Sequence, residues 1–153
     1  MKERTPIKRA KQLQPLSRDH HHTLLLCWKI RKGFAKDIAP ERIKKYADWF
    51  FENHILPHFV AEESYIFPIL GSENELVKKA LMEHRRLTRL FNDDEAERSL
   101  SLIEEELEKH IRFEERVLFN EIQQKASSEQ LALVSSLHEE HSFVDLKDDE
   151  FWK

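Results

Sequence analysis

The sequence contains little glycine, proline or cysteine, and each shortage excludes a class of fold. Only two of its 153 residues are glycine and five are proline, which is too few for the many tight turns of a sheet protein. Charged residues make up 35% of the chain, a composition typical of long helices. The single cysteine, Cys27, excludes an intrachain disulfide framework and favours a cytoplasmic protein.

The chain also lacks a strong net charge and long apolar segments. Its formal charge of −4 provides no positive field to attract nucleic acid. No apolar run approaches the roughly 18 residues of a membrane span. The basic N-terminus is not followed by the apolar segment of a signal peptide. We therefore expect a single domain that binds neither nucleic acid nor membranes, with an oligomeric state that the sequence leaves open.

Apolar positions with helical spacing predict four long helices and a shorter fifth helix. The long helices should span 17–33, 41–70, 73–92 and 98–125, and the fifth should begin at 127 or 128. The fifth helix presents Leu131, Val134 and Leu137 on one face, with His138 as a further candidate for that face.

The regions at the two ends of the chain differ from this helical pattern. Residues 1–15 are basic and include two prolines, so we expect a flexible arm. Residues 16–125 should form one bundle of helices, and residues 126–153 the short helix and an acidic tail. Pro57 lies inside the second long helix and cannot donate a backbone hydrogen bond, so it should kink that helix beside His58.

The segment from His54 to Glu62 places a potential metal ligand at every fourth residue. This spacing drifts only about 40° per step in an α-helix, so His54, His58 and Glu62 share one face. The same face carries Phe50 and Tyr65, and we expect it to be buried. A buried carboxylate costs several kcal/mol unless a partner or a metal compensates it. A salt bridge would explain Glu62 alone, and we interpret His54 as a packed histidine near the metal.

Each of the four long helices carries a histidine on its apolar face, and two of these histidines are followed four residues later by a glutamate. Side chains at this spacing lie about 5–6 Å apart, so both can reach the same metal pair. An antiparallel bundle that joins the four faces suits two metal ions bridged by the glutamates. Such donors favour iron or manganese over copper, and we expect iron. The predicted ligands are His20, His58, Glu62, His84, His110 and Glu114.

Two alternatives remain open within this set. Histidines 20–22 point about 100° apart, and His20 is best placed for the apolar face, with His21 next. Glu114 is in phase with the apolar positions of its helix, which include Val117, but the adjacent Glu115 is an alternative. No E-x-x-H step is present, which argues against a ferritin-like site.

Residues 16–122 resemble the hemerythrin-like (HHE cation-binding) domain family. The matching motifs are R-D-H at 18–20, H-F-V-A-E-E at 58–63, E-H-R-R-L at 83–87 and H-I-R-F-E-E at 110–115. The resemblance implies an up-down-up-down four-helix bundle that holds two non-haem iron ions joined by an oxo or hydroxo group. It implies the same six ligands, with Glu62 and Glu114 as the bridges.

The sequence departs from the oxygen-carrying hemerythrins at two points. Those proteins have a second histidine in their third helix, whereas Ala80 and Thr88 lie four residues on either side of His84. One iron would therefore keep an open position. The spacing in those carriers would also select Glu115 instead of Glu114. In both respects the sequence is more similar to the four-histidine, two-glutamate form of bacterial iron-sulfur repair proteins.

Three functions are compatible with these observations. The leading hypothesis is a di-iron protein that binds or senses O2, NO or iron, because an apolar bundle with an open coordination position admits a diatomic gas. The second is an enzyme that repairs iron-sulfur centres or reduces NO or peroxide with external electrons, although no flavin motif or cysteine pair is present. The third is a metal-free helical interaction module.

Overall fold

The computed structural model describes residues 8–137 and 143–153. Within these residues the chain forms helices and no strand, which confirms the all-α prediction. In chain order the elements are η1 (Lys11–Leu13), α1 (Gln14–Ala35), α2 (Pro40–Phe50), η2 (Phe51–Ile55), α3 (Leu56–Ala61), η3 (Glu62–Ile66), η4 (Phe67–Ile69), α4 (Glu75–Phe91), α5 (Ala96–Phe113), η5 (Glu114–Leu118), α6 (Phe119–Lys125) and α7 (Ser128–Leu137).

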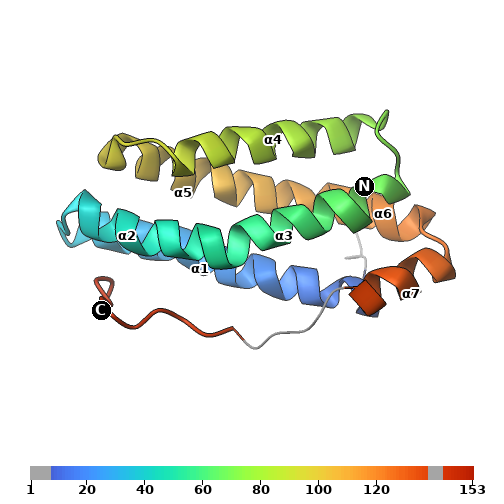
Figure 1. The fold of residues 1–153 in the computed structure, drawn as a ribbon, viewed down its shortest axis with the longest axis horizontal. Coiled ribbons are helices and arrows are strands. Elements are labelled where there is room, and N and C mark those ends of the chain that lie inside the picture. The colour runs from blue at the N-terminus through green and yellow to red at the C-terminus, as the bar shows by residue number, and fades with distance from the viewer. Residues whose placement is uncertain (1–7, 138–142) are drawn as a thin grey trace, which may run out of the picture.

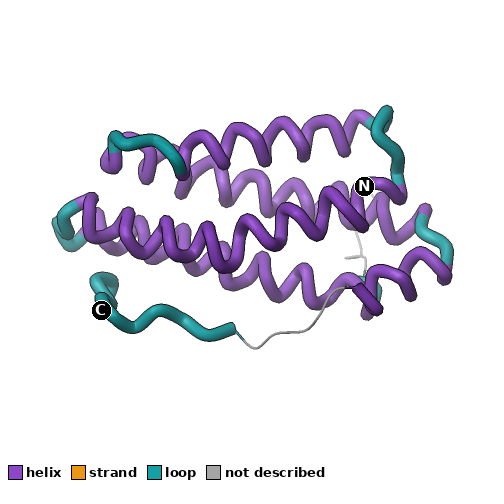
Figure 2. The backbone as a smooth tube through the Cα atoms, in the orientation of Figure 1, coloured by secondary structure: helices purple, strands orange, loops and turns teal. Residues whose placement is uncertain are grey.

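The long helical segments lie side by side (Figures 1 and 2). The elements from α2 to η4 follow one another without a break and form one rod, as do α5, η5 and α6. Helix α1 packs against α2 and α5, and α4 packs against α5. No helix in the described ranges is long and apolar enough to cross a membrane.

The buried apolar side chains form two clusters, and each long segment contributes to both. On α1, His20 follows Leu16 of one cluster and precedes Leu26 of the other. His84 occupies the equivalent place on α4. It follows Ala80, which belongs to the same cluster as Leu16, and precedes Leu87, which belongs to the same cluster as Leu26. A layer of polar side chains therefore separates two apolar cores.

Among the described residues, three π-helical turns interrupt the two long rods, and two of these turns begin at predicted ligands. Turn η3 begins at Glu62 and η5 at Glu114. Each turn is closed by a backbone N–H that donates to the carbonyl of that glutamate, five residues back. The third turn, η2, directly precedes α3, which has Pro57 in its first turn. Such turns frequently occur at functional sites.

The π-helical turns explain why two residues predicted to face inward are exposed. One extra residue in a turn moves every following inward position one residue along the chain. Tyr65 and Val117 are therefore 41% and 44% exposed, whereas Ile66 and Leu118 are buried in their place.

Helix α1 ends at Ala35 instead of near Gly33, so Gly33 is not the residue that stops the helix. Its role is close packing, because a Cβ atom there would lie 2.6 Å from Ile43 Cδ1 and 2.9 Å from Phe151 Cε1. The chain turns after α1 through Asp37, which has a φ of 56°. This left-handed conformation is one that aspartate adopts more readily than most residues.

The N-terminal segment differs from the predicted flexible arm from residue 8 onward. Leu13 is fully buried in the cluster that contains Phe119, and Arg9 forms hydrogen bonds to Asn120 and Gln123 of α6. Helix α1 begins at Gln14, before the predicted start of the first helix at residue 17. Although the arm is basic in composition, its apolar residue Leu13 holds it against the helices. Residues 1–7 and the candidate His138 lie outside the described residues.

The acidic tail packs against α1 and α2 (Figure 1). Phe151 and Trp152 are buried in the cluster that those helices line. Lys29 Nζ donates to Tyr46 Oη at 2.8 Å and to Asp145 Oδ2 at 2.6 Å, and Tyr46 Oη donates to Asp145 Oδ1 at 2.5 Å. Lys29 Nζ also lies 4.0 Å from the centre of the Trp152 ring. The tail is therefore held by its own chain.

Candidate metal centre

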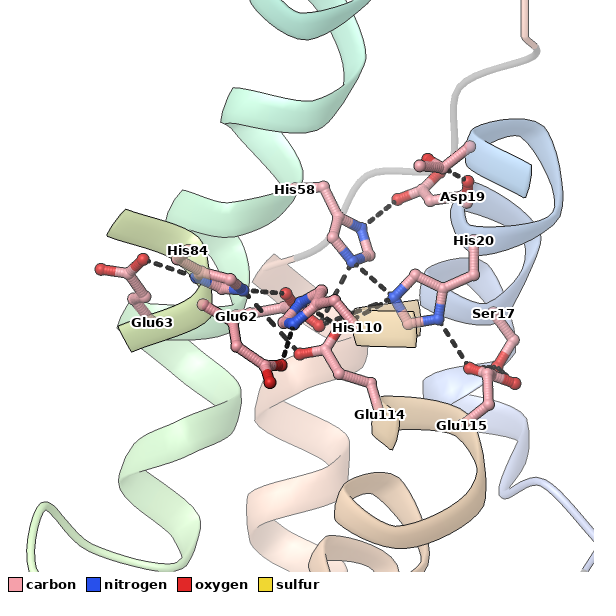
Figure 3. A network of polar contacts seen from close by, with 12 residues as sticks. Ser17, Asp19, His20, His58, Glu62, Glu63, His84, His110, Glu114 and Glu115 are labelled. Atoms are coloured by element: carbon pink, nitrogen blue, oxygen red, sulfur yellow. Dashed lines mark hydrogen bonds and ion pairs between the residues drawn. The ribbon is translucent and has the colours of Figure 1, made fainter. Parts of the chain in front are cut away.

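The six predicted ligands meet between the two apolar clusters (Figure 3). All six side chains are buried, and both glutamates have no accessible surface. They come from six different elements: His20 from α1, His58 from α3, Glu62 from η3, His84 from α4, His110 from α5 and Glu114 from η5.

The six side chains form two overlapping groups that share both glutamates. Within each group, one potential ligand atom from every member lies within 4.8 Å of the others. The first group consists of His20, His58, Glu62 and Glu114, and the second of Glu62, His84, His110 and Glu114.

In the first group, the Nε2 atoms of both histidines point toward the shared carboxylates (Figure 3). His20 Nε2 lies 3.0 Å from Glu114 Oε1, and His58 Nε2 lies 3.2 Å from Glu62 Oε2. The two Nε2 atoms are 3.0 Å from each other. The four donor atoms are therefore close enough to contact one ion.

The second group repeats this arrangement with the other two histidines. His84 Nε2 lies 3.2 Å from Glu62 Oε1, and His110 Nε2 lies 3.3 Å from Glu114 Oε1. His84 Nε2 is also 3.9 Å from Glu114 Oε2. Each glutamate thus lies next to one histidine of each group, which is the arrangement that a bridging ligand requires.

Several polar atoms at this centre have no hydrogen-bond partner within the described residues. They are both carboxylate oxygens of Glu62, Oε2 of Glu114 and the Nε2 atoms of His84 and His110. His20 Nε2 is within hydrogen-bond distance of Glu114 Oε1 and of His58 Nε2, whereas the short contacts of Glu62, His84 Nε2 and His110 Nε2 are not hydrogen bonds. A buried, unpaired polar atom costs about 1–3 kcal/mol, more if it is charged. The donor set therefore fits a metal ion, which would bind these atoms.

The outer nitrogen of each histidine is held by a second carboxylate, and we call these four acids the orienting carboxylates. Nδ1 of His20 lies 2.7 Å from Glu115, that of His58 3.0 Å from Asp19, that of His84 2.7 Å from Glu63 and that of His110 2.7 Å from Glu83. Each orienting carboxylate is adjacent in the sequence to a predicted ligand, and it contacts a histidine that belongs to a different element.

The orienting carboxylates connect the helices in a closed cycle. Asp19 of α1 contacts His58 of α3, and Glu63, from the same rod as His58, contacts His84 of α4. Glu83 of α4 then contacts His110 of α5, and Glu115, from the same rod as His110, contacts His20 of α1. Every pair of neighbours in the cycle is therefore fixed by one contact.

These contacts determine which nitrogen of each histidine is available to a metal. A carboxylate accepts a hydrogen bond only from a protonated nitrogen, so it favours the tautomer with hydrogen on Nδ1. The lone pair of a neutral imidazole then lies on Nε2 and points to the centre. Metal-binding histidines in proteins usually have such a partner, which also fixes the ring orientation.

The centre is strongly coupled electrostatically. Burial alone would lower the pKa of His110, but Glu114 and Glu83 outweigh burial and raise it to about 10. Burial is likewise outweighed at His58, whose pKa Glu62 and Asp19 raise well above the usual value. Burial would raise the pKa of Glu114, but His110 and His20 hold it well below the usual range. The metal-free centre therefore retains protons on its histidines.

The structure places the residues that the sequence left open. His21 is exposed, whereas His20 faces the centre. Glu115 turns outward to His20 Nδ1, and Glu114 points inward. His54 is partly buried one turn before the centre, where its ring lies 4.7 Å from that of Phe143. It belongs to neither of the two groups.

Sequence reasoning missed the contacts of the orienting carboxylates, since it named Glu115 only as an alternative ligand and did not select the other three. Glu63 and Glu115 were visible as the second acid of each H-x-x-x-E-E motif, and Asp19 and Glu83 as the acid before a predicted histidine. A residue adjacent to an inward ligand points about 100° away from it. That direction leads toward the neighbouring helix. The acid that recurs next to a predicted ligand on each helical segment was therefore the sequence feature that could have predicted these contacts.

Comparison with known proteins adds no relative to this description. No protein-family model matches the sequence. No curated protein and no solved structure matches it either.

Proposed function

We propose that this chain is a non-haem di-iron protein, similar to the hemerythrin-like domains, whose centre binds a small diatomic ligand such as O2 or NO. One observation carries the proposal: two groups of four buried donors share both Glu62 and Glu114. Two separate metal sites would not need common carboxylates, whereas a bridged pair does. Imidazole nitrogen with carboxylate oxygen is a donor set that suits iron.

The proposal includes the fold of the family. Helix α1, the rod from α2 to η4, helix α4 and the rod from α5 to α6 would be the four members of an up-down-up-down bundle. Glutamates from the second and fourth members would then bridge the two irons. Histidines from all four members would be the terminal ligands.

The donor count supports the binding of an external ligand. Each ion would receive two imidazole nitrogens and one oxygen from each glutamate, and an octahedral ion has more positions than these donors fill. When bound, iron would supply a redox-active Lewis acid there. Aromatic rings line the donors: Phe59 stacks on His84 at 3.7 Å and Phe119 on His20 at 5.2 Å. These apolar walls favour an uncharged gas over water.

Binding is favoured over turnover because the chain has no reactive thiol that could pass electrons to the centre. Cys27, the single cysteine, is buried, and burial raises the pKa of its thiol to about 12. A thiol of this kind is unreactive, since the thiolate is the reactive form. Electrons for catalysis would have to come from another molecule.

Anaerobic titration with Fe2+ tests the proposal directly. We expect about two irons per chain, and a change of the near-ultraviolet and visible spectrum when O2 or NO is added. Replacing Glu114 by Gln should reduce uptake strongly, because an amide brings no negative charge to either ion. Glu52→Gln, on the exposed side of the rod from α2 to η4, is the matched control. Absence of iron uptake by the unmodified chain, or full uptake by Glu114→Gln, would refute the proposal.

A further inference from the structure

We propose that Arg9 is a positioning residue for the part of the metal centre that contains His20. Its guanidinium fastens the π-helical turn η5, from which Glu114 and Glu115 reach the centre. The inference rests on the proposed function, because it concerns the affinity of one of the two ions. It assigns a role to a segment whose sequence indicated only a solvated basic arm.

Arg9 spans the junction between η5 and α6. Its Nη2 donates to the backbone carbonyl of Glu115 at 2.6 Å and lies 3.9 Å from the Glu115 carboxylate. Its Nη1 donates to Asn120 Oδ1 at 3.2 Å and to Gln123 Oε1 at 3.1 Å. Gln123 in turn accepts the backbone N–H of Ala10 at 3.1 Å. One side chain therefore ties the arm to the turn and to the helix that follows it.

The turn that Arg9 holds lacks the regular hydrogen bonds of an α-helix, so contacts from outside the helix help to fix its conformation. Turn η5 is closed by a hydrogen bond from Phe119 to the carbonyl of Glu114, five residues back, in place of the regular bonds of an α-helix. The conformation of this turn sets two directions at once. Glu114 points from it into the centre, and Glu115 points from it to His20 (Figure 3). A change in the turn would move a bridging ligand and an orienting carboxylate together.

Arg9 reaches His20 by a second route through an aromatic ring. The guanidinium carbon of Arg9 lies 5.4 Å from the centre of the Phe119 ring. Phe119 stacks on the imidazole of His20 with the two rings inclined by 20°. Arg9 therefore contacts both the ring that packs on His20 and the residue that bonds to its Nδ1. Ser17 adds a further hold, because its hydroxyl donates to the Glu115 carboxylate at 2.9 Å.

Among the orienting carboxylates that the structure describes, the arm contacts Glu115, which orients His20 of the first group. In the second group, His84 is oriented by Glu63, whose side chain is 43% exposed. The described residues give Glu63 no ion pair to an arginine. Loss of Arg9 should therefore weaken the ion held by His20 and His58 more than the ion held by His84 and His110, which shares only Glu114 with the turn that Arg9 holds. Changes to residues that orient metal-binding histidines typically cost about 10-fold to 100-fold in metal affinity.

Anaerobic Fe2+ titration against a competing chelator, resolved into two dissociation constants, tests this role in the full-length chain. We expect Arg9→Ala to raise one Kd by about 10-fold or more and the other by a smaller factor, because the two ions would share Glu114. Arg42→Ala is the matched control, since the guanidinium of Arg42 also joins distant segments by hydrogen bonds, but it joins α2 to Asp149 of the tail. It should change neither constant.

A second variant separates positioning from stability. Arg9→Lys retains the positive charge, but a lysine cannot bond to several acceptors in a fixed fork. It should also raise one Kd while the metal-free chain keeps the thermal midpoint of the unmodified protein. If both Arg9 variants bind two irons with unchanged constants, the role of Arg9 is refuted and the di-iron proposal stands. If the unmodified chain does not bind two irons, the proposed function itself fails.

Discussion

Metal binding should become much stronger as the pH rises, because protons occupy the histidines of the metal-free centre. Glu62 and Glu63 outweigh burial and raise the pKa of His84, and the pKa of His110 reaches about 10. The imidazole of His110 therefore carries an extra proton near neutral pH, and that of His84 keeps its extra proton to a higher pH than an ordinary histidine. Since a metal ion binds only the neutral form through Nε2, binding in the second group must release these protons.

The expected magnitude follows from the number of protons released. Each released proton makes Kd about tenfold lower per pH unit, which corresponds to about 1.4 kcal/mol. Between about pH 6 and about pH 8, release from His110 alone predicts roughly 100-fold tighter binding. Release of a proton from His84 as well would make this change larger.

Competition between the protein and a chromophoric chelator, with Fe2+ under anaerobic conditions at three pH values, measures this dependence. His21→Ala serves as the matched control, because His21 is an exposed histidine beside the centre and its removal should leave the slope unchanged. A Kd that stays constant over the two pH units would refute the reasoning. So would a Kd that rises with pH.

Three further predictions test other parts of the structure. Glu63→Gln should weaken the ion at His84 by about 10-fold to 100-fold, because a carboxylate no longer holds its Nδ1; an unchanged Kd in the same titration would contradict this. In the metal-free chain, the urea midpoint should fall as the pH rises from about 7 to about 10. Raised histidine pKa values mean that the folded state binds more protons than the unfolded state. The stability that these histidines contribute is therefore complete below about pH 6.5 and is lost progressively as the pH rises through their folded pKa values. A urea midpoint that stays constant over this range would contradict the prediction. Asp145→Ala should cost about 1–3 kcal/mol in the free energy of unfolding, because Lys29 and Tyr46 lose their shared acceptor. The number of irons bound should stay the same, and full stability in urea would show that the tail contacts contribute nothing.

Helical periodicity was sufficient to identify the side chains that meet at the centre. A residue on the apolar face of a long helix is buried wherever that helix packs, so the inward direction of His20, His84 and His110 could be predicted without knowing which helices are neighbours. The same reasoning placed Glu114 inward ahead of Glu115. Helical periodicity failed at Tyr65 and Val117. The apolar positions that precede a π-helical turn do not reveal that the turn contains an extra residue, so the shift of the inward positions after it could not be predicted.

The partners of these side chains depended on the tertiary structure. Glu63 and Glu115 follow inward glutamates in the sequence, but only the packing of one helix beside the next decides which histidine each contacts. Arg9 and Asp145 lie far along the chain from the residues they hold. The sequence by itself therefore determined which faces are buried, since that is a local property of helix geometry. Which acid orients which histidine, and where the arm and the tail are anchored, was decided only by contacts between distant segments.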